Sequence, residues 1–184
     1  MIRAFDIIFS VLGLIVLSPM LLIIWLLGWL DKRAPLFRQE RVGRHQQPFV
    51  LVKFRTMRPD TLSVATHLVD ASSVTAFGRF LRRTKLDEMP QLWNVLGGEM
   101  SLVGPRPCLF NQEELIAERA ARGVFDARPG ITGLAQLQGI DMSTPELLAQ
   151  ADARMLSELT VCNYFKFIFL TILGKGSGDG VKIK

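Results

Sequence analysis

Residues 7–30 form one uninterrupted apolar run that contains no charged side chain. A straight α-helix of this length reaches about 36 Å at 1.5 Å per residue, which is enough to cross the hydrocarbon core of a bilayer. The run is too long for the apolar region of a signal peptide, and it lacks the small residues of a cleavage site. The sequence therefore predicts that this segment enters a membrane.

Ser18 and Pro19 lie at the midpoint of the run. Proline lacks the backbone N–H that would bond the preceding turn, so a bend is expected, and the Ser18 hydroxyl is placed to satisfy the released carbonyl. Arg3 precedes the run, and Lys32 and Arg33 follow it. A simple span carries Arg3 across the membrane, whereas a helix that dips in and returns keeps both flanks in the cytosol. These features alone leave both geometries open.

The chain after the run alternates polar and apolar residues around Gly43, which predicts a β-hairpin with strands over 36–41 and 49–54. Residues 58–73 are polar and predict a loop. Helical patterns and end signals follow, and we expect helices over 75–83, from Asp87 to Gly97-Gly98, over 111–123, and from Thr144 to about Tyr164. The expected fold class is α+β and mostly helical.

Several residues mark where these helices begin and end. Pro90 is tolerated only in a first turn, and Asn111 with Glu114 has the pattern of a capping box. Residues 128–141 are rich in Gly and Pro, so they are expected to be loop or turn. The apolar stretch 164–173 is too short to span a bilayer, and it suits either an interfacial helix or a buried core helix.

The net charge of +5 indicates an anionic partner. Nucleic acid, anionic lipid and a phosphorylated substrate would all satisfy this charge. No nucleic-acid-binding module is recognisable, and the membrane segment argues against nucleic acid as the partner. The charge therefore favours lipids or phosphorylated substrates.

The adjacent carboxylates Asp87 and Glu88 are the best candidates for chemistry. Taken alone, an acidic pair at a helix start is commonly a cap or a partner of the helix dipole. Here Arg82 and Lys85 precede the pair, and Arg106 follows in a Pro-Arg-Pro turn. Carboxylates that bind Mg²⁺ or attack phosphorus, together with arginines that bind phosphate oxygens, suit phosphoryl transfer. Neither a P-loop nor a Rossmann glycine motif is present.

At this point the chain resembles the monotopic phosphoglycosyl transferases, which form a bacterial sugar transferase family, over nearly its whole length. Apart from the Ser-Pro break, the matching stretches are RAFD at 3–6, FRQERVG at 37–43, VKFRTM at 52–57, KLDEMPQLWNV at 85–95, MSLVGPRP at 100–107 and RPGITG at 128–133. Several such motifs in one order are highly specific.

The resemblance implies a reaction and a set of site residues. Asp87 is implied to be the nucleophile that attacks the β-phosphate of a UDP-sugar, releasing UMP and leaving a covalent phosphosugar, which a polyprenyl (undecaprenyl) phosphate then accepts. Glu88 matches the partner carboxylate. The implied cofactor is Mg²⁺, with Asp87 as its first ligand. The implied phosphate-binding residues are Arg82 and Arg106, with Lys53 and Arg128 as further candidates for the same pocket.

The family also implies a location and an architecture. Its Ser-Pro break makes a re-entrant helix, so residues 1–31 are expected to enter and leave the bacterial inner membrane on the cytosolic face. Residues 32–184 would then form a membrane-associated catalytic domain with interfacial amphipathic helices and affinity for anionic lipid. The chain resembles the minimal catalytic form of the family. The sequence does not indicate an oligomeric state.

Three departures from the common family pattern leave the transferred sugar undefined. Leu134 replaces a frequent Trp, 138–140 replace Asn-Gly-Arg, and the residues after Asp152 lack paired tyrosines. Two other functions are compatible with parts of the sequence. One is a non-catalytic membrane-surface adaptor that binds anionic lipids, and the other is hydrolysis of UDP-sugars by water. The intact Asp87, Glu88 and Arg106 count against the adaptor.

Overall fold

The computed structural model describes residues 1–58 and 73–174. Its helices are α1 (Ile2–Lys32), α2 (Ala76–Thr84), α3 (Gln91–Gly97), α4 (Glu113–Ala121), α5 (Leu134–Leu137), α6 (Pro145–Ser157) and α7 (Val161–Ile172), with short 3-10 turns η1 (Arg44–Gln46), η4 (Leu86–Glu88) and η5 (Val124–Asp126). The strands are β1 (Leu36–Val42), β2 (Pro48–Phe54), β3 (Ser101–Val103) and β4 (Gly130–Thr132). The expected class, mostly helical with a small sheet, is confirmed.

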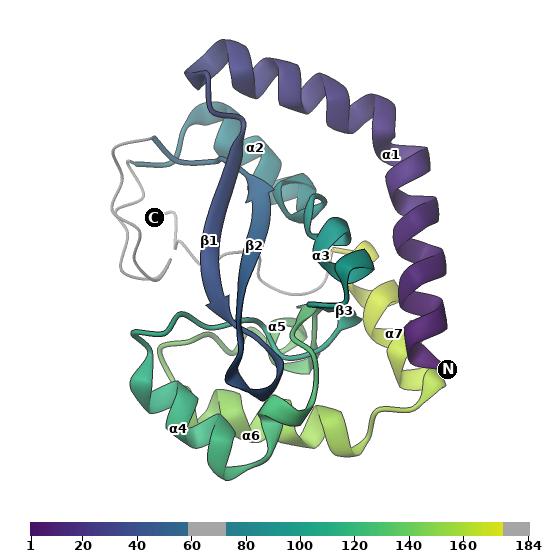
Figure 1. Ribbon diagram of the computed structural model, residues 1–184, viewed down its shortest axis with the longest axis vertical. Coiled ribbons are helices and arrows are strands. Elements are labelled where there is room, and N and C mark those ends of the chain that lie inside the picture. The colour runs from purple at the N-terminus through teal and green to yellow at the C-terminus, as the bar shows by residue number, and fades with distance from the viewer. Residues whose placement is uncertain (59–72, 175–184) are drawn as a thin grey trace.

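The apolar run forms the long helix α1, which bends partway along its length (Figure 1). Pro19 lies inside the helix, and the Ser18 hydroxyl donates to the Ile15 carbonyl at 2.7 Å. In a regular helix the Ile15 carbonyl would accept the N–H of residue 19, which proline lacks. The Ser18 hydroxyl replaces that donor, so the predicted role of Ser18 is confirmed. Within the described residues, α1 is the one helix long and apolar enough to cross a membrane. Only 11% of its most apolar stretch is buried inside the protein.

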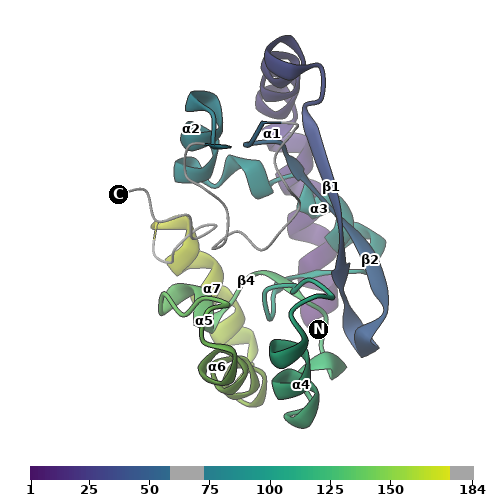
Figure 2. The same ribbon diagram turned by 90° about the vertical axis from the view of Figure 1, so that its left-hand side faces the viewer.

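The predicted hairpin is confirmed, with each strand one residue longer than expected. β1 and β2 pair antiparallel from Leu36 opposite Phe54 to Val42 opposite Pro48. The hairpin runs along the length of the molecule, with α2 near one end and with α4 and α6 near the other (Figures 1 and 2). The predicted helix over 75–83 is also present as α2, and Thr75 caps it by accepting the Gly78 N–H at 3.0 Å. Most of the expected 58–73 loop, residues 59–72, lies outside the described residues.

The expectation that 128–141 is all loop is wrong. Residues of this segment form β4, which pairs in parallel with β3, and also α5. Each strand is three residues long, too short for alternation to reveal it. Gly104 and Gly130 let the two backbones approach, since a Cβ atom at Gly130 would lie 2.0 Å from the Gly104 nitrogen. The glycines that suggested a loop therefore allow close strand packing.

Two helix starts differ from the prediction. The helix expected from Asp87 is divided into the turn η4 and the helix α3, and Pro90 is the residue before α3. Gly98 ends α3 in the left-handed conformation, with φ of 87°, as expected. Asn111 does not cap α4, because α4 begins after Gln112, whose side-chain oxygen instead accepts the Leu109 N–H at 2.9 Å.

The helix expected from Thr144 to Tyr164 is two helices, α6 and α7. The helix is interrupted at 158–160. The Thr160 hydroxyl accepts the Asn163 N–H at 3.2 Å and caps α7. Tyr164 and Phe167 on α7 are buried, while Phe169 and Ile172 are exposed. The helix thus has one face in the core and one apolar face outside it.

Candidate active site

Asp87 and Glu88 lie in the tight turn between α2 and α3. Lys85 ends α2 in the left-handed conformation, with φ of 58°, and the chain then enters η4, which packs against β2. A left-handed non-glycine residue is uncommon and turns the chain sharply. The Asp87 residue is only 2% exposed and Glu88 is 7% exposed. The acidic pair is therefore a buried feature of a turn rather than a cap at the surface.

Arg106 lies beside this turn and forms an ion pair with Glu88. Its Nη2 atom is 2.8 Å from Oε1 of Glu88, although the two residues are 18 positions apart in the sequence. Burial lowers the pKa of Lys85, the Glu88 charge opposes this effect, and the Arg106 charge adds to it. Glu88, Arg106 and Lys85 therefore form one electrostatic cluster at the end of α2.

The backbone around Arg106 is held from several directions. The carbonyl oxygens of four consecutive residues each accept a hydrogen bond, and the donors come from three segments of the chain: β1, α4 and β4. The pairs are Gly130 N to Pro105 O (2.8 Å), Arg119 Nη1 to Arg106 O (2.8 Å), Arg41 Nη1 to Pro107 O (3.1 Å) and Val42 N to Cys108 O (2.9 Å). With two prolines in the turn, these bonds fix the point from which the Arg106 side chain projects.

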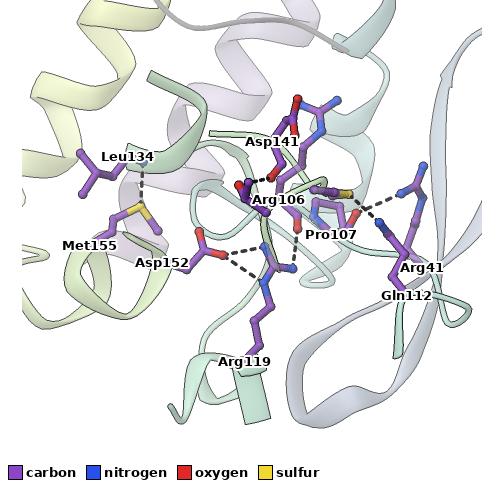
Figure 3. A network of polar contacts seen from close by, with 11 residues as sticks. Arg41, Arg106, Pro107, Gln112, Arg119, Leu134, Asp141, Asp152 and Met155 are labelled. Atoms are coloured by element: carbon purple, nitrogen blue, oxygen red, sulfur yellow. Dashed lines mark hydrogen bonds and ion pairs between the residues drawn. The ribbon is translucent and has the colours of Figure 1, made fainter. Parts of the chain in front are cut away.

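Arg119, which donates to the Arg106 carbonyl, also forms a buried ion pair with Asp152 (Figure 3). Its Nε and Nη2 atoms donate to Oδ2 of Asp152 at 3.0 and 2.6 Å, and each residue is 1% exposed. Burial raises the pKa of Asp152, and the Arg119 charge opposes that shift. The pair links α4 to α6 and supplies the donor for the Arg106 carbonyl.

The other predicted phosphate-binding residues are held by different parts of the fold. Arg82 on α2 donates from Nε to Thr56 Oγ1 at 2.9 Å, and its buried Nη1 atom has no hydrogen-bond partner in the described part of the chain. Lys53 on β2 is buried, with its Nζ atom 5.7 Å from the Phe37 ring centroid. Arg128 is held at the far end of α3, where Nε donates to the Gly98 carbonyl at 2.7 Å.

The carboxylates present suit a magnesium ion that is shared with substrate. Across residues 1–58 and 73–174, no group of three or more His, Cys, Asp or Glu side chains could hold a metal ion. Mg²⁺ does not require such a cage, because it is usually bound by one or two carboxylates together with waters and substrate phosphates. Asp87 and Glu88 are carboxylates of this kind, and Glu88 is paired with Arg106 in this structure.

Sequence reasoning missed the residues that support the turn. Arg41, Arg119 and Asp152 were not predicted as part of the site, although all three are buried. One signal was present, since Arg119 lies four residues after Leu115 on the buried face of α4. A charged residue on such a face needs a buried partner, but the sequence does not say which one.

Comparison with known proteins now identifies the family. The family model described as Bacterial sugar transferase matches residues 1–175. The chain belongs to the bacterial sugar transferase family. It is 41% identical over 177 residues to the Exopolysaccharide production protein PSS of Rhizobium leguminosarum bv. phaseoli, covering 90% of this chain and 87% of the relative. Asp87, Glu88 and Arg106 thus lie in a protein of the family that the sequence resembled.

Two further relatives carry names that state a reaction. The UDP-glucose:undecaprenyl-phosphate glucose-1-phosphate transferase of Caulobacter vibrioides is 39% identical over 182 residues, which cover 92% of this chain and 67% of the relative. The Undecaprenyl-phosphate galactose phosphotransferase of Salmonella typhimurium is 33% identical over 186 residues, with 92% and 39% covered. The chain therefore corresponds to less than half of the Salmonella family member.

The buried Arg119–Asp152 pair gives a testable prediction for stability. Arg119→Met should reduce the free energy of unfolding by about 3–5 kcal/mol, because it leaves the Asp152 carboxylate buried without its partner. Adding Asp152→Leu should restore part of this loss, since no unpaired charge remains. Denaturant unfolding in detergent measures both.

A matched control uses the exposed Arg154–Glu158 pair, whose Nε–Oε1 distance is 3.0 Å. Arg154→Met should change the free energy of unfolding by less than about 1 kcal/mol, because solvent screens that pair. The Arg119→Met and Asp152→Leu changes are also measured singly. If the double variant lost as much free energy of unfolding as the two single variants together, the coupling between the two residues would be contradicted.

Proposed function

We propose that this protein transfers a sugar phosphate from a UDP-sugar to undecaprenyl phosphate and releases UMP. The observation that carries the proposal is the buried Asp87-Glu88 turn joined to Arg106, in a chain with a largely exposed apolar helix. Membership of the bacterial sugar transferase family supports the same reaction class. The reactions in the names of the Caulobacter and Salmonella relatives support the donor and the acceptor.

The first step is a displacement at the β-phosphorus of the donor. A carboxylate oxygen of Asp87 bonds to this phosphorus, and the bond from phosphorus to the oxygen that bridges the two phosphates breaks. UMP leaves with that oxygen, and the phosphosugar stays on Asp87 as an acyl phosphate. Glu88 stays paired with Arg106 and holds that guanidinium beside the acidic turn.

The second step is a displacement at the same phosphorus. A phosphate oxygen of undecaprenyl phosphate attacks, the bond to Asp87 breaks, and the carboxylate is regenerated. The product is an undecaprenyl diphosphate sugar. Both steps place negative charge on phosphate oxygens, so nearby guanidinium groups stabilise both transition states.

Arg106 and Arg82 are the residues we assign to those phosphate oxygens. Arg106 is already fixed beside the acidic turn, and a guanidinium can bind two oxygens in a fixed geometry. Arg82 offers a buried Nη1 atom without a hydrogen-bond partner among the described residues. Lys53 and Arg128 remain predicted phosphate-binding residues, and Arg128 would act from the far end of α3.

Asp87, with Glu88 next to it, would hold Mg²⁺ together with donor phosphate oxygens. When bound, the ion neutralises part of the diphosphate charge. Glu88 also orients Arg106 through their ion pair, and this role does not depend on the metal. Two adjacent carboxylates are consistent with Mg²⁺, because the remaining ligands of this ion usually come from substrate and water.

We further propose that α1 is re-entrant and places the site on the cytosolic face of the bacterial inner membrane. The Ser18–Ile15 bond stabilises the bend at Pro19. Basic residues on both flanks favour the same side of the membrane for both ends. A site at this level receives a water-soluble donor from one side and a lipid phosphate from the other, and its basic residues would attract anionic lipid.

The test is a UMP-release assay with a panel of UDP-sugars, undecaprenyl phosphate and Mg²⁺. UMP release that requires the lipid phosphate supports the proposal and defines the sugar. No UMP release with any donor would favour a membrane-surface adaptor. UMP release at the same rate without lipid would identify a hydrolase.

Asp87→Asn should lower UMP release by roughly 10³-fold or more, because a carboxamide does not attack phosphorus effectively. Radiolabelled donor should leave a phosphosugar on the unsubstituted protein and none on the variant. Asp126→Asn, at an exposed carboxylate outside the turn, is the control and should retain full activity. Near-normal turnover by Asp87→Asn would remove Asp87 from the mechanism.

Arg106→Lys should reduce kcat by about 10–100-fold, because a point charge loses the two-point geometry of the guanidinium. The same change at the exposed Arg154 should have no effect. Steady-state kinetics with the preferred donor measure this difference. Unchanged kcat and KM for Arg106→Lys would contradict phosphate contact by Arg106.

Pro19→Ala should straighten α1 and move the N-terminus to the outside, because alanine restores the helical N–H. An added N-terminal cysteine, in a Cys162→Ser background that removes the exposed native thiol, reports this through an impermeant reagent. The parent should be labelled only after permeabilisation, and Pro19→Ala should be labelled in intact cells. External labelling of the parent would show that α1 spans the bilayer.

A further inference from the structure

The first turns of α1 carry polar residues on the face that meets the rest of the protein. Arg3, Asp6 and Ser10 are three and four positions apart, so they lie on one side of the helix. Asp6 is 2% exposed and Ser10 is fully buried. A Cβ atom at Gly13, one turn further along, would lie 3.1 Å from the Leu92 side chain on α3. This face of the membrane helix is therefore packed against the protein rather than against lipid.

Asp6 bonds to both β3 and α7. Its Oδ1 atom accepts hydrogen bonds from the Leu102 N–H at 3.0 Å, the Ser101 hydroxyl at 3.0 Å and the Tyr164 hydroxyl at 2.8 Å. Burial raises the pKa of Tyr164, and its bond with the Asp6 carboxylate raises it further, so the hydroxyl stays a donor. Because a buried carboxylate is costly without hydrogen-bond donors, these three bonds hold Asp6 in one position against β3 and α7.

Arg3 bonds to the connection between α3 and β3. Its guanidinium donates to the carbonyls of Val95 at 2.7 Å, Leu96 at 3.2 Å and Met100 at 3.4 Å. The first two are among the last carbonyls of α3, which lack the usual donor four residues on, and the Val95 carbonyl also accepts the Gly98 N–H at 3.1 Å. A cation at this position also complements the negative end of the helix dipole.

These contacts are made to the segment that carries the proposed catalytic groups. Residues 86–106 run from η4 through α3 and β3 to the Pro-Arg-Pro turn. Glu88 and Arg106 lie at the two ends of this segment and are joined by their 2.8 Å ion pair. Arg3 and Asp6 hold the middle of the segment, where α3 passes into β3.

We infer that Arg3 and Asp6 are positioning residues for the transfer reaction. They fix α3 relative to β3 from the membrane helix, and so set where Asp87 and Glu88 lie relative to Arg106. This inference rests on the proposed function. It assigns the beginning of α1 a role that differs from anchoring, because anchoring needs the exposed apolar side chains, such as Leu12 and Ile15, and not these buried polar groups.

The experiment compares Asp6→Ala and Arg3→Gln with the conservative change Asp6→Asn, in purified protein and in membranes. Asp6→Ala and Arg3→Gln should lower kcat for UMP release by about 10–100-fold, since small misplacements of catalytic groups have effects of this size. The KM for the UDP-sugar should change by less than about threefold, because the donor contacts stay in place. Asp6→Asn keeps a carbonyl oxygen acceptor and should retain most activity.

Ser10→Ala is the matched control. Ser10 lies on the same buried face, but its hydroxyl has no hydrogen-bond partner within the described residues, so its removal should leave kcat unchanged. Membrane co-sedimentation and thermal unfolding are measured for every variant. Arg3→Gln, which changes a partly exposed residue, is the second variant should Asp6→Ala fail to fold.

Loss of kcat in a protein that remains folded and membrane-bound, with recovery in Asp6→Asn, supports the inference. Unchanged kcat in both Arg3→Gln and Asp6→Ala would overturn it. Loss of activity that parallels release from the membrane or unfolding would also overturn it, in favour of simple anchoring. Failure of the parent protein to release UMP with any donor would instead refute the proposed function.

Discussion

The ion pair between Glu88 and Arg106 joins two parts of the chain that are shaped independently. Glu88 is placed by the left-handed turn at Lys85, and Arg106 by hydrogen bonds to the carbonyls around it. Neither element would hold its charged side chain in place alone, because a buried carboxylate and a partly buried guanidinium each lose solvation. Their pairing offsets that cost and gives the acidic turn a defined position relative to Arg106.

The support for this pair reaches far from the turn itself. Arg119 contributes both to the Arg106 carbonyl and to Asp152, so the packing of α4 on α6 is linked to the position of Arg106. On the opposite side, the hairpin contributes through Arg41 and Val42. Loss of one such contact shifts a turn that several elements share, and the effects of substitutions here should be coupled rather than additive.

The sequence predicted the elements whose signals are local, and it failed where a partner lies far along the chain. The hairpin was predictable from alternation, and the Ser18–Pro19 break from the chemistry of proline. The β3–β4 pairing was not, because three residues per strand show no period and Gly130 suggested a loop. Asp87, Glu88 and Arg106 were predicted as candidates from motifs, whereas the contact of Asp152 with Arg119, 33 positions away, could be recognised only in the structure.

The burial of Asp87 bears on how a phosphosugar would survive between the two displacements. An acyl phosphate is open to hydrolysis, and water is its most abundant competitor in the cytosol. At 2% exposure, Asp87 is shielded from bulk water. A site that excludes water favours transfer over hydrolysis. In the proposed reaction the acceptor is a lipid phosphate, so it would reach this carboxylate from the side of α1, whose apolar surface is largely exposed.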